Sequence, residues 1–109
     1  EDGDTPLHQA SFDGQVQVVQ YLVGRGADIN TRNYFDETPL YVAAMNEQFD
    51  VVRLLAMHDA DLHATAHDGQ TAFDVAATEQ IGDWLIAFAR RRQAGMRAAA
   101  AAAAANVDT

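Results

Sequence analysis

A run of histidines and aspartates between positions 58 and 68 contains side chains that could bind a metal ion. It contains three residues of each type: His58, Asp59, Asp61, His63, His67 and Asp68. Imidazole and carboxylate groups are ligands that suit zinc, nickel and copper. The run spans the expected end of a helix, a turn and a loop, so these side chains need not converge on one point. We therefore expect no metal site and no cofactor.

Two hydroxyl residues stand three positions before a possible base, which raises the question of catalysis. These pairs are Thr5 with His8 and Thr71 with Asp74. A histidine beside a hydroxyl could act as a general base. The sequence, however, contains no nucleophile elbow, no phosphate-binding loop and no glycine-rich turn between a strand and a helix. We therefore predict that the chain is not an enzyme.

Size and composition narrow the class of protein. The 109 residues, 49% of them hydrophobic, are enough for one compact unit or a few stacked repeats. The sequence has no cysteine, which excludes disulfides, thiolate metal sites and a cysteine nucleophile. Small secreted domains usually need disulfides, so we expect an intracellular protein, cytoplasmic or nuclear. No apolar run approaches the roughly 20 residues that span a bilayer, so we expect no membrane contact.

The net charge of −9 is unevenly distributed along the chain. Residues 1–89 contain fifteen acidic residues and three arginines, a net charge of −12, whereas residues 90–109 have a net charge of +3. An acidic body repels phosphate groups, so we expect no nucleic-acid binding by this part of the chain.

The sequence matches itself at a shift of 33 residues. The matching segments pair as follows: Thr5-Pro6-Leu7 with Thr38-Pro39-Leu40, Val18-Val19 with Val51-Val52, and Ala27-Asp28 with Ala60-Asp61. A second shift pairs Thr38 with Thr71 and Ala43-Ala44 with Ala76-Ala77. Such a period indicates stacked units that bury their apolar faces against one another.

The local chemistry predicts two helices in each unit. Thr5 and Thr38 are good helix N-caps, and the proline that follows each of them suits the first helical position. Apolar residues then recur at helical spacing. The expected bounds are 6–13, 39–46 and 72–79 for the short helices, and 16–23, 49–57 and 81–92 for the longer ones. Polar stretches at 28–37 and 61–70 predict projecting turns or hairpins.

These motifs, taken in register, resemble the ankyrin repeat. The signature is carried by Thr5-Pro6-Leu7-His8, Gly14-Gln15, Val18-Val19 and Gly26-Ala27-Asp28-Ile29-Asn30. The resemblance covers residues 2 to about 89 and implies an all-α dominated solenoid of helix-turn-helix units with β-hairpin fingers. It implies repeats at 1–33, 34–66 and 67–92, the last of terminal type. The alanine-rich tail at 93–109 predicts a C-terminal helical extension, because alanine favours helices. In this family the threonine–histidine pair is a structural hydrogen bond.

The departures from the family pattern lead to further expectations. Asp36 replaces the finger glycine and Glu47 the glycine between the helices, so we expect both turns of the second repeat to be distorted. Tyr41 replaces the motif histidine. The second helix of the first repeat keeps the apolar pattern of an interior repeat, including Tyr21 and Leu22. We therefore predict further ankyrin repeats upstream in the parent protein.

The resemblance also implies where a partner protein would bind. In ankyrin repeats the finger tips and the outer end of the first helix line a concave groove. The matching positions are Phe12, Asp13, Arg32, Tyr34, Phe35, Glu37, Met45, Asn46, His67, Asp68 and Gln70. We expect at least one of Tyr34 and Phe35 to contact a partner, since aromatic residues and arginine are enriched at binding hot spots. The alternative is that one of them packs under its own finger.

The function that these features predict is a protein–protein interaction module, as an adaptor, a scaffold or the regulatory domain of a larger protein. The acidic rim predicts a partner with some positive charge. One alternative is a structural subunit or spacer of a large assembly, docked through the basic, alanine-rich C-terminal helix. Another is an ankyrin region attached to a catalytic domain elsewhere in the protein. Asn30 also matches the pattern of asparagine hydroxylation; alternatively, its side chain simply bonds the local backbone.

Overall fold

The computed structural model describes residues 3–107, and the side chains of residues 3–99. Within residues 3–107 it contains helices but no β-strand: α1 (Pro6–Asp13), α2 (Val16–Gly24), α3 (Pro39–Met45), α4 (Phe49–Met57), α5 (Ala72–Val75) and α6 (Glu79–Val107). Residues 1–2 of the expected first repeat and 108–109 of the expected tail lie outside the described residues. None of the described helices is both long and apolar enough to cross a membrane.

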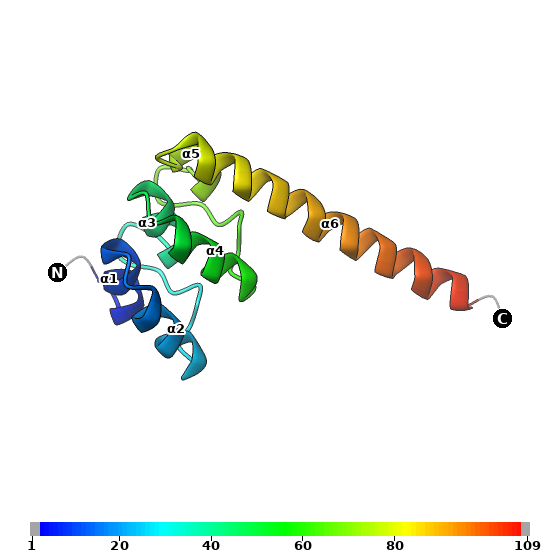
Figure 1. The fold of residues 1–109 in the computed structure, drawn as a ribbon, viewed down its shortest axis with the longest axis horizontal. Coiled ribbons are helices and arrows are strands. Elements are labelled where there is room, and N and C mark those ends of the chain that lie inside the picture. The colour runs from blue at the N-terminus through cyan, green and yellow to red at the C-terminus, as the bar shows by residue number, and fades with distance from the viewer. Residues whose placement is uncertain (1–2, 108–109) are drawn as a thin grey trace.

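The helices form stacked antiparallel pairs, and the last helix runs far beyond the stack (Figure 1). The short helices form one layer, in which α3 packs between α1 and α5. The longer helices form the second layer, where α4 packs against α2. The projecting part of α6 gives the molecule its longest dimension, 57 Å against 31 and 25 Å. The predicted solenoid with a C-terminal helical extension is confirmed.

The first two helix pairs begin and end close to where the caps predict. The Thr5 hydroxyl accepts a hydrogen bond from the His8 N–H, and the Thr38 hydroxyl accepts one from the Tyr41 N–H at 3.2 Å. Each such bond satisfies an amide of the first turn that has no partner within the helix. α1 then ends at Asp13, and the following residue, Gly14, adopts the left-handed conformation with φ 71°. These capping residues therefore explain why the short helices form where they do.

The helices of the third pair do not begin and end at the expected residues. α5 ends at Val75 rather than at residue 79, because Ala76 departs from the helical conformation, with ψ 119°, and the Ala77 N–H donates to the Ala44 carbonyl at 3.0 Å. Thr78 then caps the following helix, since its hydroxyl accepts from the Ile81 N–H at 3.2 Å. α6 therefore begins at Glu79 instead of residue 81. It continues without a break past residue 92, into the alanine-rich segment.

The fingers are tight turns without an assigned β-ladder in residues 3–107. In the first finger the Asn33 N–H donates to the Glu37 carbonyl at 3.1 Å, and in the second the Ala66 N–H donates to the Gln70 carbonyl at 2.8 Å. The fingers also touch each other, because the His67 N–H donates to the Phe35 carbonyl at 2.9 Å. The expected hairpins are thus present only as single closed turns, too short to form paired strands.

The turns of the second repeat have the same backbone conformation as the equivalent turns of the neighbouring repeats. Asp36 has φ 59°, and its equivalents 33 residues away, Gly3 and Gly69, have φ 74° and 83°. Glu47 has φ 64° against 71° at its equivalent, Gly14. The expected distortion of these turns is therefore wrong. The residues that replace glycine adopt the left-handed conformation themselves, because the surrounding stack fixes the path of the chain.

The core lies between the two layers and follows the repeat. Leu7 and Leu40 from the short helices are at most 2% exposed, and Leu55 and Leu85 from the longer helices are fully buried. Burying a side chain of this size stabilises the fold by about 1.5–3 kcal/mol. Fewer side chains are buried at the first helix pair. Val19 is the sole fully buried residue of α2, and Leu22 is half-buried. On the same helix Tyr21 is 63% exposed.

Candidate interaction surface

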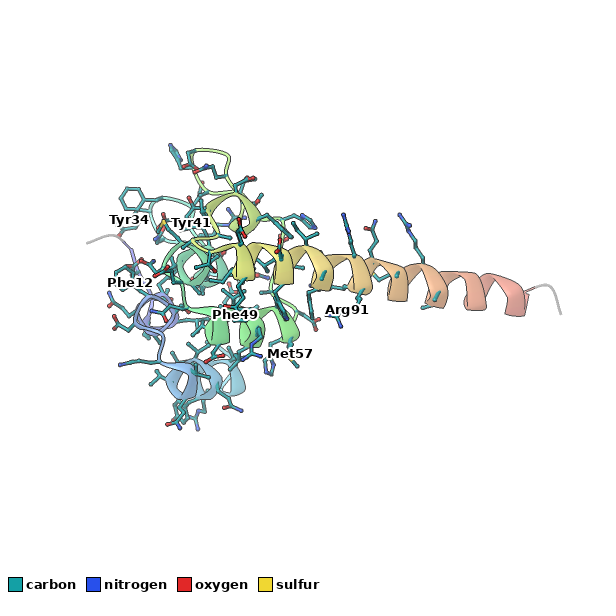
Figure 2. The ribbon with its side chains drawn as sticks, turned by 45° about the horizontal axis from the view of Figure 1, so that its top comes forward. Phe12, Tyr34, Tyr41, Phe49, Met57 and Arg91 are labelled. Carbon is teal, nitrogen blue, oxygen red and sulfur yellow. The ribbon has the colours of Figure 1, made fainter. Side chains whose placement is uncertain are left out.

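Large apolar side chains are exposed along the edge formed by the finger tips and the ends of the short helices. Tyr34 is 76% exposed, Phe12 and Phe35 are 53% exposed, and Met45 is 40% exposed. Figure 2 shows Phe12, Tyr34 and Tyr41 at the same edge of the molecule, whereas Phe49 and Met57 lie elsewhere. Neither aromatic residue of the first finger is buried beneath it. The sequence-predicted positions therefore include an apolar, solvent-accessible patch.

Each finger tip packs on the equivalent of the finger glycine in the preceding unit. The Tyr34 ring lies against Gly3, so closely that a methyl group on Gly3 would come within 2.6 Å of the ring. The side chain of His67, which is 33 positions after Tyr34, lies 3.9 Å from the Asp36 carboxylate. This arrangement sets the spacing of successive finger tips, and it holds one edge of the Tyr34 ring while the rest stays exposed.

Asn33 organises the first finger, a role that sequence reasoning missed. Its side-chain oxygen accepts from the Phe35 N–H at 2.9 Å and from the Glu37 N–H at 3.0 Å. Its amide nitrogen donates to the carboxylates of Asp4 at 3.0 Å and Glu37 at 2.9 Å. Asparagine commonly bonds backbone amides two residues ahead, so its position at the start of a turn was the available signal.

Arg32 is exposed, but the structure uses its guanidinium to join the fingers. The Nη1 group donates to the Thr65 carbonyl at 2.7 Å and to the Asp36 carbonyl at 3.2 Å. These bonds hold the side chain between the two fingers. The arginine therefore shapes the surface, and any contact with a partner must use its remaining N–H groups.

The other sequence-predicted positions divide between exposed and structural residues. Asp13 is exposed at the end of α1. Asn46 bonds the Val42 carbonyl at the end of α3 at 2.8 Å, and Asp68 accepts from the Gln70 N–H at 3.1 Å. Glu37 belongs to the Asn33 network. These polar groups keep the turns rigid beside the exposed aromatic residues.

Tyr41 lies beside this surface and is only 4% exposed. Its ionisation is affected by nearby carboxylates. Burial raises the pKa of the Tyr41 hydroxyl, and the negative charges of Asp68, Glu37 and Asp74 raise it further. Three carboxylates from two fingers and α5 therefore act on one point. Negative charge beside Tyr41 would favour cationic groups on this candidate surface.

The two hydroxyl–base pairs are structural. His8 accepts at Nδ1 from the Thr5 N–H at 3.1 Å, and its Nε2 reaches the Glu37 carbonyl of the next unit at 2.7 Å. Asp74 likewise accepts from the Thr71 N–H at 2.9 Å and from the Thr71 hydroxyl at 3.2 Å. In both pairs the candidate base is occupied in capping a helix. Among the described residues no group of three or more His, Cys, Asp or Glu side chains could hold a metal ion.

Asn30 connects two units instead of bonding its own local backbone. Its side-chain oxygen accepts from the Asp61 N–H at 2.8 Å, while its own N–H donates to the Asp28 carboxylate at 3.0 Å. The residue is exposed. Hydroxylation of Asn30 therefore stays a prediction, and the structural alternative acts between repeats.

Comparison with known proteins agrees with this architecture. The family model for ankyrin repeats, in three copies, matches residues 7–88, which is well over half of the chain. A search of curated proteins finds no match. Ankyrin repeats are generally protein–protein interaction modules and are typically non-catalytic. The chain therefore belongs to the ankyrin repeat family.

Proposed function

We propose that this chain is a protein-binding module that holds a partner on the edge formed by its finger tips and short helices, and that it performs no catalysis itself. The observation that carries the proposal is the exposure of Tyr34 and Phe35 on adjacent positions of one rigid turn. Exposed aromatic side chains with few rotatable bonds provide contact area at a low entropic cost. The module would act as an adaptor, a scaffold or a regulatory domain of a larger protein.

The partner that best fits this surface carries positive charge beside an apolar group. Asp68, Glu37 and Asp74 produce a negative potential at Tyr41, next to the exposed aromatic residues. Asp13 adds a further exposed carboxylate at the end of α1. A lysine or arginine of the partner would meet these charges while an apolar side chain packs on Tyr34 and Phe35.

The test is a pull-down from native lysate with three forms of the chain, followed by mass spectrometry. The forms are the wild type, the double variant Tyr34→Ala/Phe35→Ala, and the control Tyr21→Ala. Tyr21 is a suitable control because it is 63% exposed but lies on α2, away from the fingers. Loss of two hot-spot rings should weaken binding at least about 30-fold. Thermal melting of each form verifies that it is folded.

A partner that is retained by Tyr21→Ala and lost by the folded double variant would support the proposal. The isolated partner should then bind less tightly as salt is raised, because part of the attraction is electrostatic. If every partner binds the double variant as strongly as the wild type, the fingers are not the site. Docking through α6, as in a structural subunit, would then become the leading explanation.

A further inference from the structure

A groove of about 640 Å³ lies between α6 and the loop that follows α4. We call residues 59–65 the second elbow, and residues 26–32, which follow α2, the first elbow. Apolar walls are provided by Leu62 of the second elbow, Phe73 of α5, and Ile86, Ala89 and Met96 of α6. In Figure 2, Tyr34 of the first finger lies at the opposite end of the stack from Arg91 of α6.

The groove exists because the third unit does not turn where the first two do. In the second unit α4 ends at Met57, the chain turns at Asp59, with φ 68°, and Ala60 and Leu62 are buried. The positions 33 residues later are Arg92, Gln93 and Gly95, and all three remain in α6. The helix therefore continues straight, and the position that a third elbow would occupy is open.

The first two elbows indicate what such a space accepts. They lie side by side, joined by the bond from the Asp61 N–H to the Asn30 side chain. Each presents a small residue, an aspartate and a large aliphatic residue in sequence: Ala27-Asp28-Ile29 and Ala60-Asp61-Leu62. In the second elbow the small and aliphatic residues are buried, at 1% and 4% exposure. A short extended segment with this pattern thus packs beside an elbow in this fold.

One arginine of the groove is available to pair with an acidic residue at the middle position. Arg92 is already engaged, because it lies 3.5 Å from the Asp59 carboxylate and donates to the Ala60 carbonyl at 3.3 Å. Arg90 also lines the groove, yet it takes part in no ion pair or side-chain hydrogen bond within residues 3–99. His63, the equivalent of Asn30, stacks on Phe73 with ring centroids 5.2 Å apart. Asp61 also lines the groove, where its carboxylate accepts from the His63 N–H at 3.0 Å. The groove therefore combines apolar walls with one arginine that has no acidic partner within residues 3–99.

We propose that this groove binds an extended segment of a partner protein with the sequence pattern small–acidic–aliphatic. The aliphatic side chain packs among Leu62, Ile86 and Met96, and the carboxylate pairs with Arg90. The segment thereby takes the place of a third elbow. This second site is independent of the finger surface and can be occupied at the same time.

The experiment is an NMR titration of the isotope-labelled full chain with a synthetic peptide. The probe has the sequence of residues 24–31, Gly-Arg-Gly-Ala-Asp-Ile-Asn-Thr, with blocked ends. Because a short flexible peptide must be ordered on binding, we expect a dissociation constant between about 0.1 and 2 mM. Amide shifts should change at the second elbow, at Phe73 and along residues 86–96. A control peptide, with asparagine in place of the aspartate and serine in place of the isoleucine, should bind at least threefold more weakly than the probe.

Two neighbouring arginines provide the matched variants. Arg90→Ala should weaken binding of the probe at least threefold, whereas Arg91→Ala, which changes an exposed arginine outside the groove lining, should leave it unchanged. Ala89→Trp should abolish binding by filling the groove, provided that its melting is unaltered. The proposal is overturned if no shift changes appear at millimolar probe, if the changes map to the fingers, or if both arginine variants weaken binding equally.

Discussion

Replacing Glu47 by glycine should stabilise the protein. Glu47 is exposed and has φ 64°, and its equivalent in the first unit is Gly14 with φ 71°. A left-handed backbone costs a residue with a Cβ about 1–2 kcal/mol. Glycine avoids that cost but loses about 0.5–1 kcal/mol through the greater entropy of the unfolded chain. We therefore expect Glu47→Gly to raise the free energy of unfolding by about 0.5–1 kcal/mol.

The assay is thermal and urea unfolding of the wild type, Glu47→Gly and Glu47→Ala. For a domain of this size the expected gain corresponds to a rise in Tm of about 2–8 °C. Glu47→Ala is the matched control, because it removes the same negative charge from an acidic protein but keeps the Cβ. Its stability should stay within about 0.5 kcal/mol of the wild type. The reasoning fails if Glu47→Gly lowers Tm, or if Glu47→Ala raises it as much as glycine does.

Three further predictions concern the core, the first finger and pH. Leu55→Ala should destabilise the protein by about 2–5 kcal/mol in urea unfolding, because Leu55 is fully buried, whereas Leu22→Ala at the equivalent half-buried position should cost less than half as much. Asn33→Ala should cost about 1–3 kcal/mol and speed hydrogen exchange at the Glu37 amide, since it leaves polar partners unsatisfied. The raised pKa of Tyr41 means that the folded state holds this proton more tightly than the unfolded state. The resulting stability is complete below about pH 10 and is lost as pH rises through the folded-state pKa, so Tyr41→Phe should flatten this part of the unfolding profile.

Sequence patterns predicted the fold because each unit carries its own start signals. Thr5-Pro6 and Thr38-Pro39 determine where α1 and α3 begin, and the repeat fixes which leucines are buried. The third unit lacks the proline, and its helix bounds were predicted less well. Thr78 is a capping residue that has no counterpart in the repeat pattern, so its effect on the start of α6 was overlooked.

The candidate site was less predictable because its geometry depends on contacts between units. Exposure of Tyr34 and Phe35 follows from their place in a turn, and the sequence indicated this. The bond from Arg32 to the Thr65 carbonyl joins residues 33 positions apart and cannot be inferred from local pattern. Similarly, Asp36 adopts the left-handed conformation within a turn closed by the bond from the Asn33 N–H to the Glu37 carbonyl, and no glycine marks this turn in the sequence.

The two fingers differ in how they are held, and this difference favours the first as the main contact. In the first finger the Asn33 side chain bonds the amides of Phe35 and Glu37, so the turn is fixed by side-chain as well as backbone bonds. Its equivalent in the second finger is Ala66, which has no polar side chain, and one side-chain bond, from the Gln70 N–H to the Asp68 carboxylate, supports that turn. A turn fixed before binding loses less conformational entropy when a partner arrives. The exposed aromatic residues thus lie on the finger that the structure holds more firmly, which supports the proposal that a partner packs there.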